Sequence, residues 1–326
     1  MIKLIKSKMK FFILSIIFFV FISQQAMSKT IFCIETDVVN VEKCVKQLNE
    51  NDVLEFDENK TFETSGIKIT EDNIKIIIPN KTKIILSDET KIKPSFGGTP
   101  ANQVIYLAGN SKKKIKNIQI ELNGTIDGNK NKHKYEDGGV EGISILWTEN
   151  VKIYGSGKII NANGDGIDID ASNGLLIENI TVQNNGASGI HFGSPRPIRS
   201  SYNNLVRNVI SIGNGFDLKK SGFDLSWPNE FGVIYHNVIA KDNYQNFNIE
   251  AYGGAIYFSE SLSTGKVLKK DFFKDASIVI LNEKDKKKNF FKITYAKLLI
   301  FKLKIKKFLG LNNLPNFIEG IQMKKY

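Results

Sequence analysis

Residues 150–192 read NVKIYGSGKIINANGDGIDIDASNGLLIENITVQNNGASGIHF, a stretch in which short apolar runs alternate with Gly and Asn. An asparagine followed by a β-branched residue recurs at a constant interval through this stretch and beyond it. The four positions are Asn150, Asn179, Asn208 and Asn237. Apolar residues alternate with polar ones inside each unit, and no segment keeps the 3.6-residue period of a helix. The pattern predicts a repeat made of strands and excludes a helical solenoid.

A second asparagine column, Asn185, Asn214 and Asn243, keeps the same interval a few positions further along. Strand-only repeats of this length stack as the coils of a parallel β-helix, because one coil cannot bury its apolar face alone. Asparagine suits a recurring turn, since it tolerates the left-handed conformation and its amide can bond the next amide in the stack. We expect roughly seven to eight coils between residues 53 and 258, with the four asparagines of the first column superposed as one ladder.

The chain has 326 residues and a formal net charge of +11, from 45 Lys and Arg against 34 Asp and Glu. The excess lies at the two ends: residues 1–28 and 259–326 are rich in lysine, whereas residues 29–258 hold slightly more acids than bases. A nucleic-acid footprint would place the basic stripe on the folded body, so the distribution argues against nucleic-acid binding. We expect a targeting segment (1–28), a repeat domain (29–258) and a basic tail (259–326).

The segment 1–28 has the features of a secretory signal peptide. Lysines precede an apolar run from Phe11 to Ile22, and small residues precede a cut after Ser28. The run is shorter than the ~20 residues of a spanning helix, and an uncleaved anchor is the alternative. We expect a secreted or periplasmic protein in which Cys33 and Cys44 form a disulfide; two free buried thiols are the alternative.

From Val41 to Phe258 the chain resembles right-handed parallel β-helix proteins of the pectin-lyase-like superfamily. Two stretches, NGTIDGN at 123–129 and NGDGIDI at 163–169, are similar to motifs of polygalacturonase-type glycoside hydrolases. The resemblance implies an all-β, single-stranded right-handed parallel β-helix with an N-terminal amphipathic cap and a basic C-terminal tail. It also implies a polysaccharide substrate and a catalytic role for Asp165, with Gly164 standing where the family motif has Thr.

The coils that follow depart from that family. Its paired aspartates would fall where this chain has Ser188 and Gly189, and its Gly-His-Gly would fall at Ser221 and Gly222. The other residues that carry chemistry must therefore come from the alternation of this chain's own strands.

Aligning the strands on their glycines gives GIDI (166–169), GIHF (189–192), GFDL (222–225) and NFNI (246–249). Because side chains alternate across a strand, the apolar residues point inward and the residues between them point outward. The expected outward column holds Ser144, Asp168, His191, Asp224 and Asn248, and the next outward column holds Leu146, Asp170, Gly193, Ser226 and Glu250.

Two carboxylates on such a column could act as the acid and the base of a glycosidase. Adjacent coils lie ~4.8 Å apart, so Asp168 and Asp224 would be roughly 10 Å apart, and Asp168 and Asp170 about 7 Å; an inverting enzyme needs ~6.5–9.5 Å. His191 between two carboxylates would have a raised pKa and could act as an acid or an orienting group. The catalytic candidates are Asp165, Asp168, His191 and Asp224. Glycan binding without chemistry and a plain solvated sheet face are the alternatives.

Cations and aromatic rings lie in or near two inserts, GSPRPIRSSYN at 193–203 and GFDLKKSG at 215–222. The cations could hold the carboxylates of an acidic glycan and the rings could stack on sugar faces, although simple solubility would also explain the cations. The candidate substrate-binding residues are Asp170, Arg196, Arg199, Lys219, Lys220, Trp227, Asn248 and Glu250. The sequence has no phosphate loop and no His and Cys set with metal-ligand spacing, so we expect neither a cofactor nor a metal.

Lysines alternate with apolar and aromatic residues in the last section, most densely between Lys284 and Lys307. This pattern suits peripheral contact with an anionic membrane surface, or a cap over the end of the coil stack. We expect a monomer. The favoured function is hydrolysis of an acidic, uronate-containing glycan by paired aspartates; a polysaccharide lyase or epimerase and a non-catalytic glycan-binding or cell-surface protein are the alternatives.

Overall fold

Three long parallel β-sheets make up most of the protein. The computed structural model describes residues 28–92, 102–134, 139–193, 203–226, 233–250, 257–259 and 261–274. The first sheet contains, in order of stacking, β1 (Thr30–Cys33), β2 (Val53–Phe56), β5 (Lys75–Ile78), β9 (Gln119–Leu122), β13 (Lys152–Tyr154), β16 (Leu176–Glu178), β19 (Asn204–Arg207), β22 (Val233–His236) and β25 (Tyr257–Ser259).

The other two long sheets follow the same order along the stack. The second contains β3 (Thr61–Thr64), β6 (Lys83–Leu86), β10 (Thr125–Asp127), β14 (Lys158–Ile160), β17 (Thr181–Gln183), β20 (Ile210–Ile212), β23 (Ile239–Lys241) and β26 (Leu262–Thr264). The third contains β4 (Ile67–Ile69), β7 (Asn102–Ala108), β11 (Val140–Leu146), β15 (Ile167–Asp170), β18 (Ile190–Phe192), β21 (Ser221–Leu225), β24 (Gln245–Glu250) and β27 (Phe272–Lys274). The short strands β8 (Ile115–Lys116) and β12 (Thr148–Glu149) form a separate pair.

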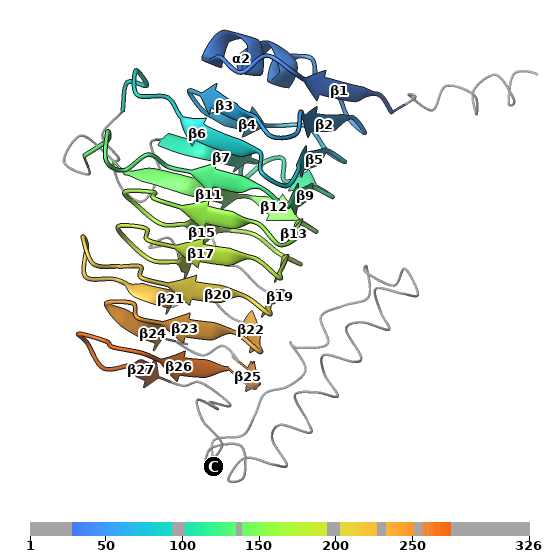
Figure 1. Ribbon diagram of the computed structural model, residues 1–326. Coiled ribbons are helices and arrows are strands. Elements are labelled where there is room, and N and C mark those ends of the chain that lie inside the picture. Colours follow the sequence, from blue (N-terminus) through green and yellow to red (C-terminus); the bar gives the residue numbers. More distant parts are fainter. Residues whose placement is uncertain are drawn as a thin grey trace, which may run out of the picture.

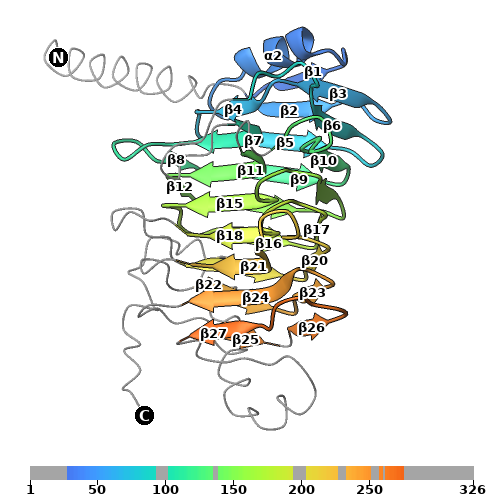
Figure 2. The same cartoon turned by 90° about the vertical axis from the view of Figure 1, so that its left-hand side faces the viewer.

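The chain visits the three sheets in turn, so that β2, β3 and β4 form one coil and β5, β6 and β7 form the next. Successive coils stack along one axis, and the strand pairings between them are parallel (Figure 1). The helix α2 (Val38–Lys46) lies over one end of the stack (Figure 2). The expectation of a parallel β-helix is therefore confirmed.

Apolar side chains fill the interior of the coils. Ile167, Ile190, Phe223 and Phe247 are fully buried and in register on neighbouring strands of the third sheet, as the alternation predicts. The rings of Phe223 and Phe247 stack with their centroids 5.3 Å apart. Burial of apolar surface, at roughly 25 cal/mol per Å2, is the main stabilising contribution. Each coil obtains it only by packing against its neighbours.

An N-terminal cap covers the first coil. The helix α2 begins after Asp37, whose side chain accepts a hydrogen bond from the backbone N–H of Asn40 (3.1 Å). Val41 on this helix is fully buried. A disulfide joins Cys33 at the end of β1 to Cys44 on α2. The cap limits the pairing of this end of the stack with other chains.

The second asparagine column forms a buried ladder. Asn185 Nδ2 donates to Asn214 Oδ1 (2.9 Å), and Asn214 Nδ2 donates to Asn243 Oδ1 (3.1 Å). The same oxygens accept the backbone N–H groups of Asn185 and Asn214. None of the three side chains is more than 1% exposed, so the amides satisfy backbone groups at turns that water does not reach.

The first asparagine column differs from the prediction at one position. Asn237 donates to Asn208 and Asn208 donates to Asn179, and the two hydrogen bonds, each 2.9 Å long, form an exposed ladder. Asn150 instead donates to Asn117 (2.6 Å) and belongs to a ladder further up the stack. The expectation of a single ladder through all four residues is therefore wrong.

Unequal coil length is the reason for this difference. Lys152 pairs with Leu176, and Leu176 pairs with Leu205. Fewer residues separate the first pair than the second, so the first of these two coils is the shorter one. The backbone N–H of Asn150 consequently bonds the carbonyl of Asn173. A constant spacing in the sequence thus did not mean a constant register in the stack.

The β-helix continues beyond the change of composition at Ser259. The strand β27 pairs with β24, and the last strand described ends at Lys274. The expected targeting segment, except Ser28, and the tail from residue 275 lie outside the described residues. In the part of the chain that the structure describes, no helix is both long and apolar enough to cross a membrane.

Replacing Asn214 by Ala should lower the free energy of unfolding by about 2–4 kcal/mol, because it leaves groups of Asn185 and Asn243 without partners in a buried turn. The matched control is Asn208→Gly, which removes an amide from the exposed ladder but tolerates the left-handed backbone there (φ 53°). It should cost less than about 1 kcal/mol. Urea unfolding measures both, and an equal loss in the two variants would contradict a structural role for the buried ladder.

Candidate functional site

A column of polar side chains follows the outward face of the third sheet. The strand pairings place Ser144, Asp168, His191, Asp224 and Asn248 in register, one on each of β11, β15, β18, β21 and β24. The outward column expected from the sequence is therefore present. Inward neighbours such as Ile169 and Phe192 fix its direction, because successive side chains of a strand point to opposite faces.

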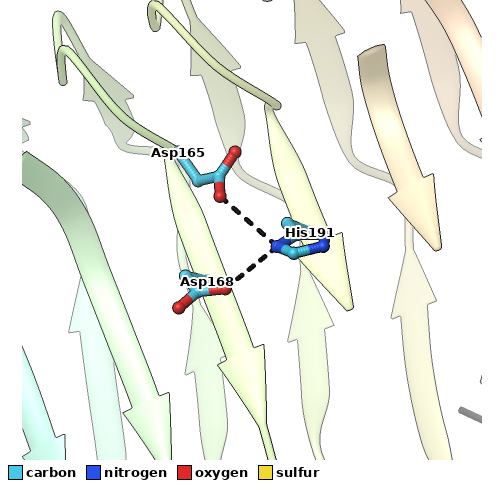
Figure 3. A group of neighbouring side chains, drawn as sticks. All are labelled: Asp165, Asp168 and His191. Carbon is cyan, nitrogen blue, oxygen red and sulfur yellow. Dashed lines mark hydrogen bonds and ion pairs between the residues drawn. The ribbon is translucent and has the colours of Figure 1, made fainter. Parts of the chain in front are cut away.

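One histidine of this region contacts two carboxylates directly. The Nδ1 atom of His191 lies 3.1 Å from Asp168 Oδ1 and 3.4 Å from Asp165 Oδ2. Asp165 stands in the turn before β15, Asp168 on that strand, and His191 on the adjacent strand β18 (Figure 3). The other ring nitrogen, Nε2, lies 3.1 Å from Ser226 Oγ. Asp165, Asp168 and His191 are called the acid–base cluster below.

The two carboxylates control the protonation of His191. Burial alone would lower the pKa of the imidazole, but its hydrogen bonds to Asp165 and Asp168, together with the charges of Asp165 and Asp224, raise this pKa well above its usual value. The imidazole is therefore a cation at neutral pH. It is held between two anions with 17% of its side chain exposed.

The cluster also has the composition of a cation site. One ligand atom from each of Asp165, Asp168 and His191 lies within 4.8 Å of the others. An imidazole that binds a metal is neutral, whereas the ion pairs of His191 Nδ1 with Asp165 and Asp168 require the protonated ring. The two states exclude each other: with His191 protonated the three side chains form an acid–base cluster, and with His191 neutral they would be the ligands of a cation.

Sequence reasoning missed Glu141, a buried carboxyl group on β11 that is 9% exposed. Its Oε2 atom accepts a hydrogen bond from the backbone N–H of Asp165. Burial first, and then the charges of Asp165 and Asp168, raise the pKa of Glu141 well above its usual value. A signal was available, because Glu141 precedes Gly-Ile in β11 just as Asp165 precedes Gly-Ile at β15.

Asp224 lies on the far side of His191 from Asp168 and is 1% exposed. It accepts hydrogen bonds from Asn248 Nδ2 (3.0 Å) and from Ser188 Oγ (3.4 Å). This burial differs from the open sheet face that the sequence suggested. Polar neighbours on adjacent coils replace the water that a carboxylate would otherwise contact.

A cleft of about 480 Å3 opens beside Asp224. Its lining contains five of the predicted site residues and five that were not predicted. The predicted residues are Lys219, Lys220, Asp224, Asn248 and Glu250, and the others are Leu218, Ser221, Ser226, Gln245 and Lys269. We call this space the lysine cleft. Lys269 lies between β26 and β27, two coils further along the stack than Lys219 and Lys220, so only the three-dimensional arrangement brings it to the other two lysines.

The remaining predicted residues are not brought into the cleft. Asp170, at the end of β15, is 5% exposed and does not line it. Arg196, Arg199 and Trp227 lie outside the described residues. The site that the structure describes therefore consists of the acid–base cluster, Glu141, Asp224 and the lysine cleft.

No protein-family model matches the chain, and no curated protein matches it. Three solved structures illustrate the likeness that does exist. They are a provisional glycosyl hydrolase from Parabacteroides merdae (16% identity, 64% of this chain and 94% of that chain, TM-score 0.48), the pectate lyase Pel9A (13%, 78% and 81%, 0.45) and a family 28 exopolygalacturonase from Yersinia enterocolitica (11%, 77% and 65%, 0.44). These are parallel β-helix proteins. The likeness concerns the fold alone, and it is the parallel sheets of this chain that confirm the expected parallel β-helix.

Proposed function

We propose that this protein binds and hydrolyses an anionic polysaccharide along the outward face of the third sheet. The observation that carries the proposal is the register of Asp168, His191 and Asp224 on three adjacent strands, with Asp224 opening onto the lysine cleft. Stacked coils repeat polar side chains every ~4.8 Å along the axis, which suits a polymer of repeating polar units. The similarity of residues 163–169 to a polygalacturonase motif supports the same substrate class.

Asp168 and Asp224 are the best pair for hydrolysis. They lie two coils apart, so their carboxyl groups are separated by roughly 10 Å, close to the ~6.5–9.5 Å that admits a water molecule in an inverting glycosidase. Asp165 and Asp168 cannot play this part together, because their nearest ligand atoms lie within 4.8 Å. We assign Asp224, which lines the cleft, to the activation of water, and the acid–base cluster to proton donation.

The raised pKa of His191 favours hydrolysis over elimination. An imidazole must be unprotonated to remove a proton from the sugar in a lyase reaction, whereas the raised pKa of His191 favours the form that already holds a proton beside Asp165 and Asp168. Its Nε2 atom contacts Ser226, which lines the lysine cleft. The imidazolium is therefore placed to supply a proton on the side of the bound glycan.

The lysine cleft supports the choice of an anionic substrate. Lys219, Lys220 and Lys269 line a polar space that also contains Asn248 and Glu250. Lysine ammonium groups bind carboxylates or sulfates as point charges, and the amide orients sugar hydroxyls. Charges so placed would select an acidic polymer over a neutral one.

Four further proposals rest on the sequence alone. The protein is exported and cleaved after Ser28, because of the basic and apolar segment that precedes this cut. Its basic tail contacts an anionic membrane surface. It acts as a monomer. It binds no nucleic acid, because the charge of the repeat domain is slightly negative.

Replacing Asp168 or Asp224 by Asn should reduce turnover of the substrate by at least about 100-fold, the usual contribution of a general acid or base. The measurement is the release of reducing ends from a panel of acidic and neutral glycans. Asp88→Asn changes an exposed carboxylate outside the site and serves as the control. Full activity in the Asp168→Asn, Asp224→Asn double variant would rule out this pair. Unsaturated sugar ends would identify a lyase instead, and binding without new ends would identify a non-catalytic protein.

Replacing Lys220 or Lys269 by Gln should raise KM for an acidic glycan about threefold to tenfold and leave kcat within about twofold, because these charges bind both ground state and transition state. The effect should shrink as salt screens the charges. Lys158→Gln, an exposed residue of β14, is the matched control. Unchanged KM values in both cleft variants at low salt would show that the lysine cleft does not bind the substrate.

The stability of the folded protein should fall as the pH rises from about 6.5, the usual pKa of His in an unfolded chain, through the raised pKa of His191. The protonated imidazole contributes fully below this window and loses its contribution above it. The test compares the free energy of unfolding against pH for the wild type and for His191→Gln, whose slope should be smaller. The pKa of Glu141 is also raised, so its contribution to stability is likewise lost as the pH rises, beginning at a lower pH. The quantity to measure is therefore the difference in unfolding free energy between the wild type and His191→Gln at each pH. Parallel curves would contradict the ion pair.

A further inference from the structure

The carboxyl group of Glu141 occupies the space beside Gly164. A Cβ atom added at Gly164 would lie 2.7 Å from Oε1 and 2.8 Å from Oε2 of Glu141. Such contacts are too short for any side chain, so the carboxyl group of Glu141 occupies the position where a larger residue would place its side chain. The Gly that replaces Thr in the motif of residues 163–169 therefore makes room for a third carboxyl group.

Glu141 and Asp165 are joined by backbone and side-chain contacts. The backbone N–H of Gly164 bonds Val140 O (2.9 Å), and that of Gly142 bonds Asp165 O (3.0 Å). Glu141 Oε2 accepts the N–H of Asp165 between these two bonds. The turn that carries Asp165 is thus fixed against the start of β11 at three successive points.

The side chain of Asp165 contacts two residues of the next coil, so the position of its turn affects theirs. Its Oδ1 atom accepts the backbone N–H of Ser188 (2.5 Å), and its Oδ2 atom lies 3.4 Å from Nδ1 of His191. A displacement of the turn would change both contacts at once. The position of the imidazolium therefore depends on a residue two coils away from it.

We propose that Glu141 is a positioning residue of this site: its carboxyl group fills the space left by Gly164 and holds Asp165 against His191. The kinetic part of this inference rests on the proposed function, whereas the geometric part does not. Glu141 faces Asp165, Asp168 and His191, and it is buried. Burial and the charges of Asp165 and Asp168 raise the pKa of Glu141, which favours the neutral acid, and the oxygen of this acid accepts the N–H of Asp165.

Glutamine has the same shape as a neutral Glu and keeps an accepting oxygen. Glu141→Gln should therefore retain kcat within about threefold, whereas Glu141→Ala should lower kcat by about 10-fold to 100-fold with little change in KM, the effect of a small misplacement of a reacting group. Gly164→Ala should lower kcat to a similar extent, because the new Cβ displaces the carboxyl group. The Glu141→Ala, Gly164→Ala double variant should be no worse than Glu141→Ala alone, since the clash has lost its partner.

A second measurement does not need a substrate. The Nδ1 proton of His191, held by Asp165 and Asp168, should give a low-field nitrogen-bound resonance in the NMR spectrum, assigned by its loss in His191→Gln. It should be unchanged in Glu141→Gln and shifted or lost in Glu141→Ala and Gly164→Ala, with circular dichroism confirming that each variant is folded. If the wild type cleaves no glycan, the proposed function fails while this resonance still decides the role of Glu141.

Three outcomes would overturn the inference. Glu141→Ala could retain both kcat and the resonance, which would show that Asp165 holds its position unaided. Glu141→Gln could lose as much as Glu141→Ala, which would mean that a charged carboxylate is required. The effects of Glu141→Ala and Gly164→Ala on kcat could multiply in the double variant, which would mean that the two positions act independently.

Discussion

The backbone register between neighbouring coils is the constraint on which the rest of this molecule depends. Parallel pairing fixes each residue opposite one residue of the next coil at ~4.8 Å, so a side chain in one coil acquires a neighbour far away in the sequence. Asp168, His191 and Asp224 are well separated along the chain, yet they face one another because β15, β18 and β21 pair in register. A one-residue slip of any one of these strands would turn its polar side chain into the core.

Register also explains how a protein can tolerate so many buried polar groups in one place. Glu141, Asp165, Asp168 and Asp224 would repel one another if all were charged and unpaired. Burial raises the pKa of Glu141 and so favours its neutral form, His191 neutralises part of the remaining charge, and Asn248 and Ser188 donate to Asp224. Donors and acceptors alternate from coil to coil in this region, so these carboxyl groups find their partners on the neighbouring coils.

The sequence predicted the parts of this structure that follow from local alternation. The inward Ile and Phe residues and the outward column through Asp168, His191 and Asp224 follow from the two-residue period of a strand, which needs no knowledge of coil length. The single ladder through Asn150 failed because coil length does vary, and turn residues alone do not reveal it. Glu141 was not identified because it lies outside the two outward columns and outside the motif at 163–169 that drew attention to Asp165. The burial of Asp224 and the place of Lys269 depend on neighbouring coils, which only the folded chain brings together.

The linear stacking of the coils bears on how the molecule comes apart. Among the described strands of the three long sheets, each coil pairs with the coil before and the coil after it and with no other, so opening can begin at one end and proceed stepwise without disrupting the middle. The N-terminal end is pinned by the disulfide between Cys33 and Cys44. The lysine cleft, through Lys269, reaches the last described coil, whereas Glu141 and Asp165 lie several coils inside the stack. Fraying from the C-terminal side would therefore release a bound polymer before it disturbed the groups assigned to proton transfer.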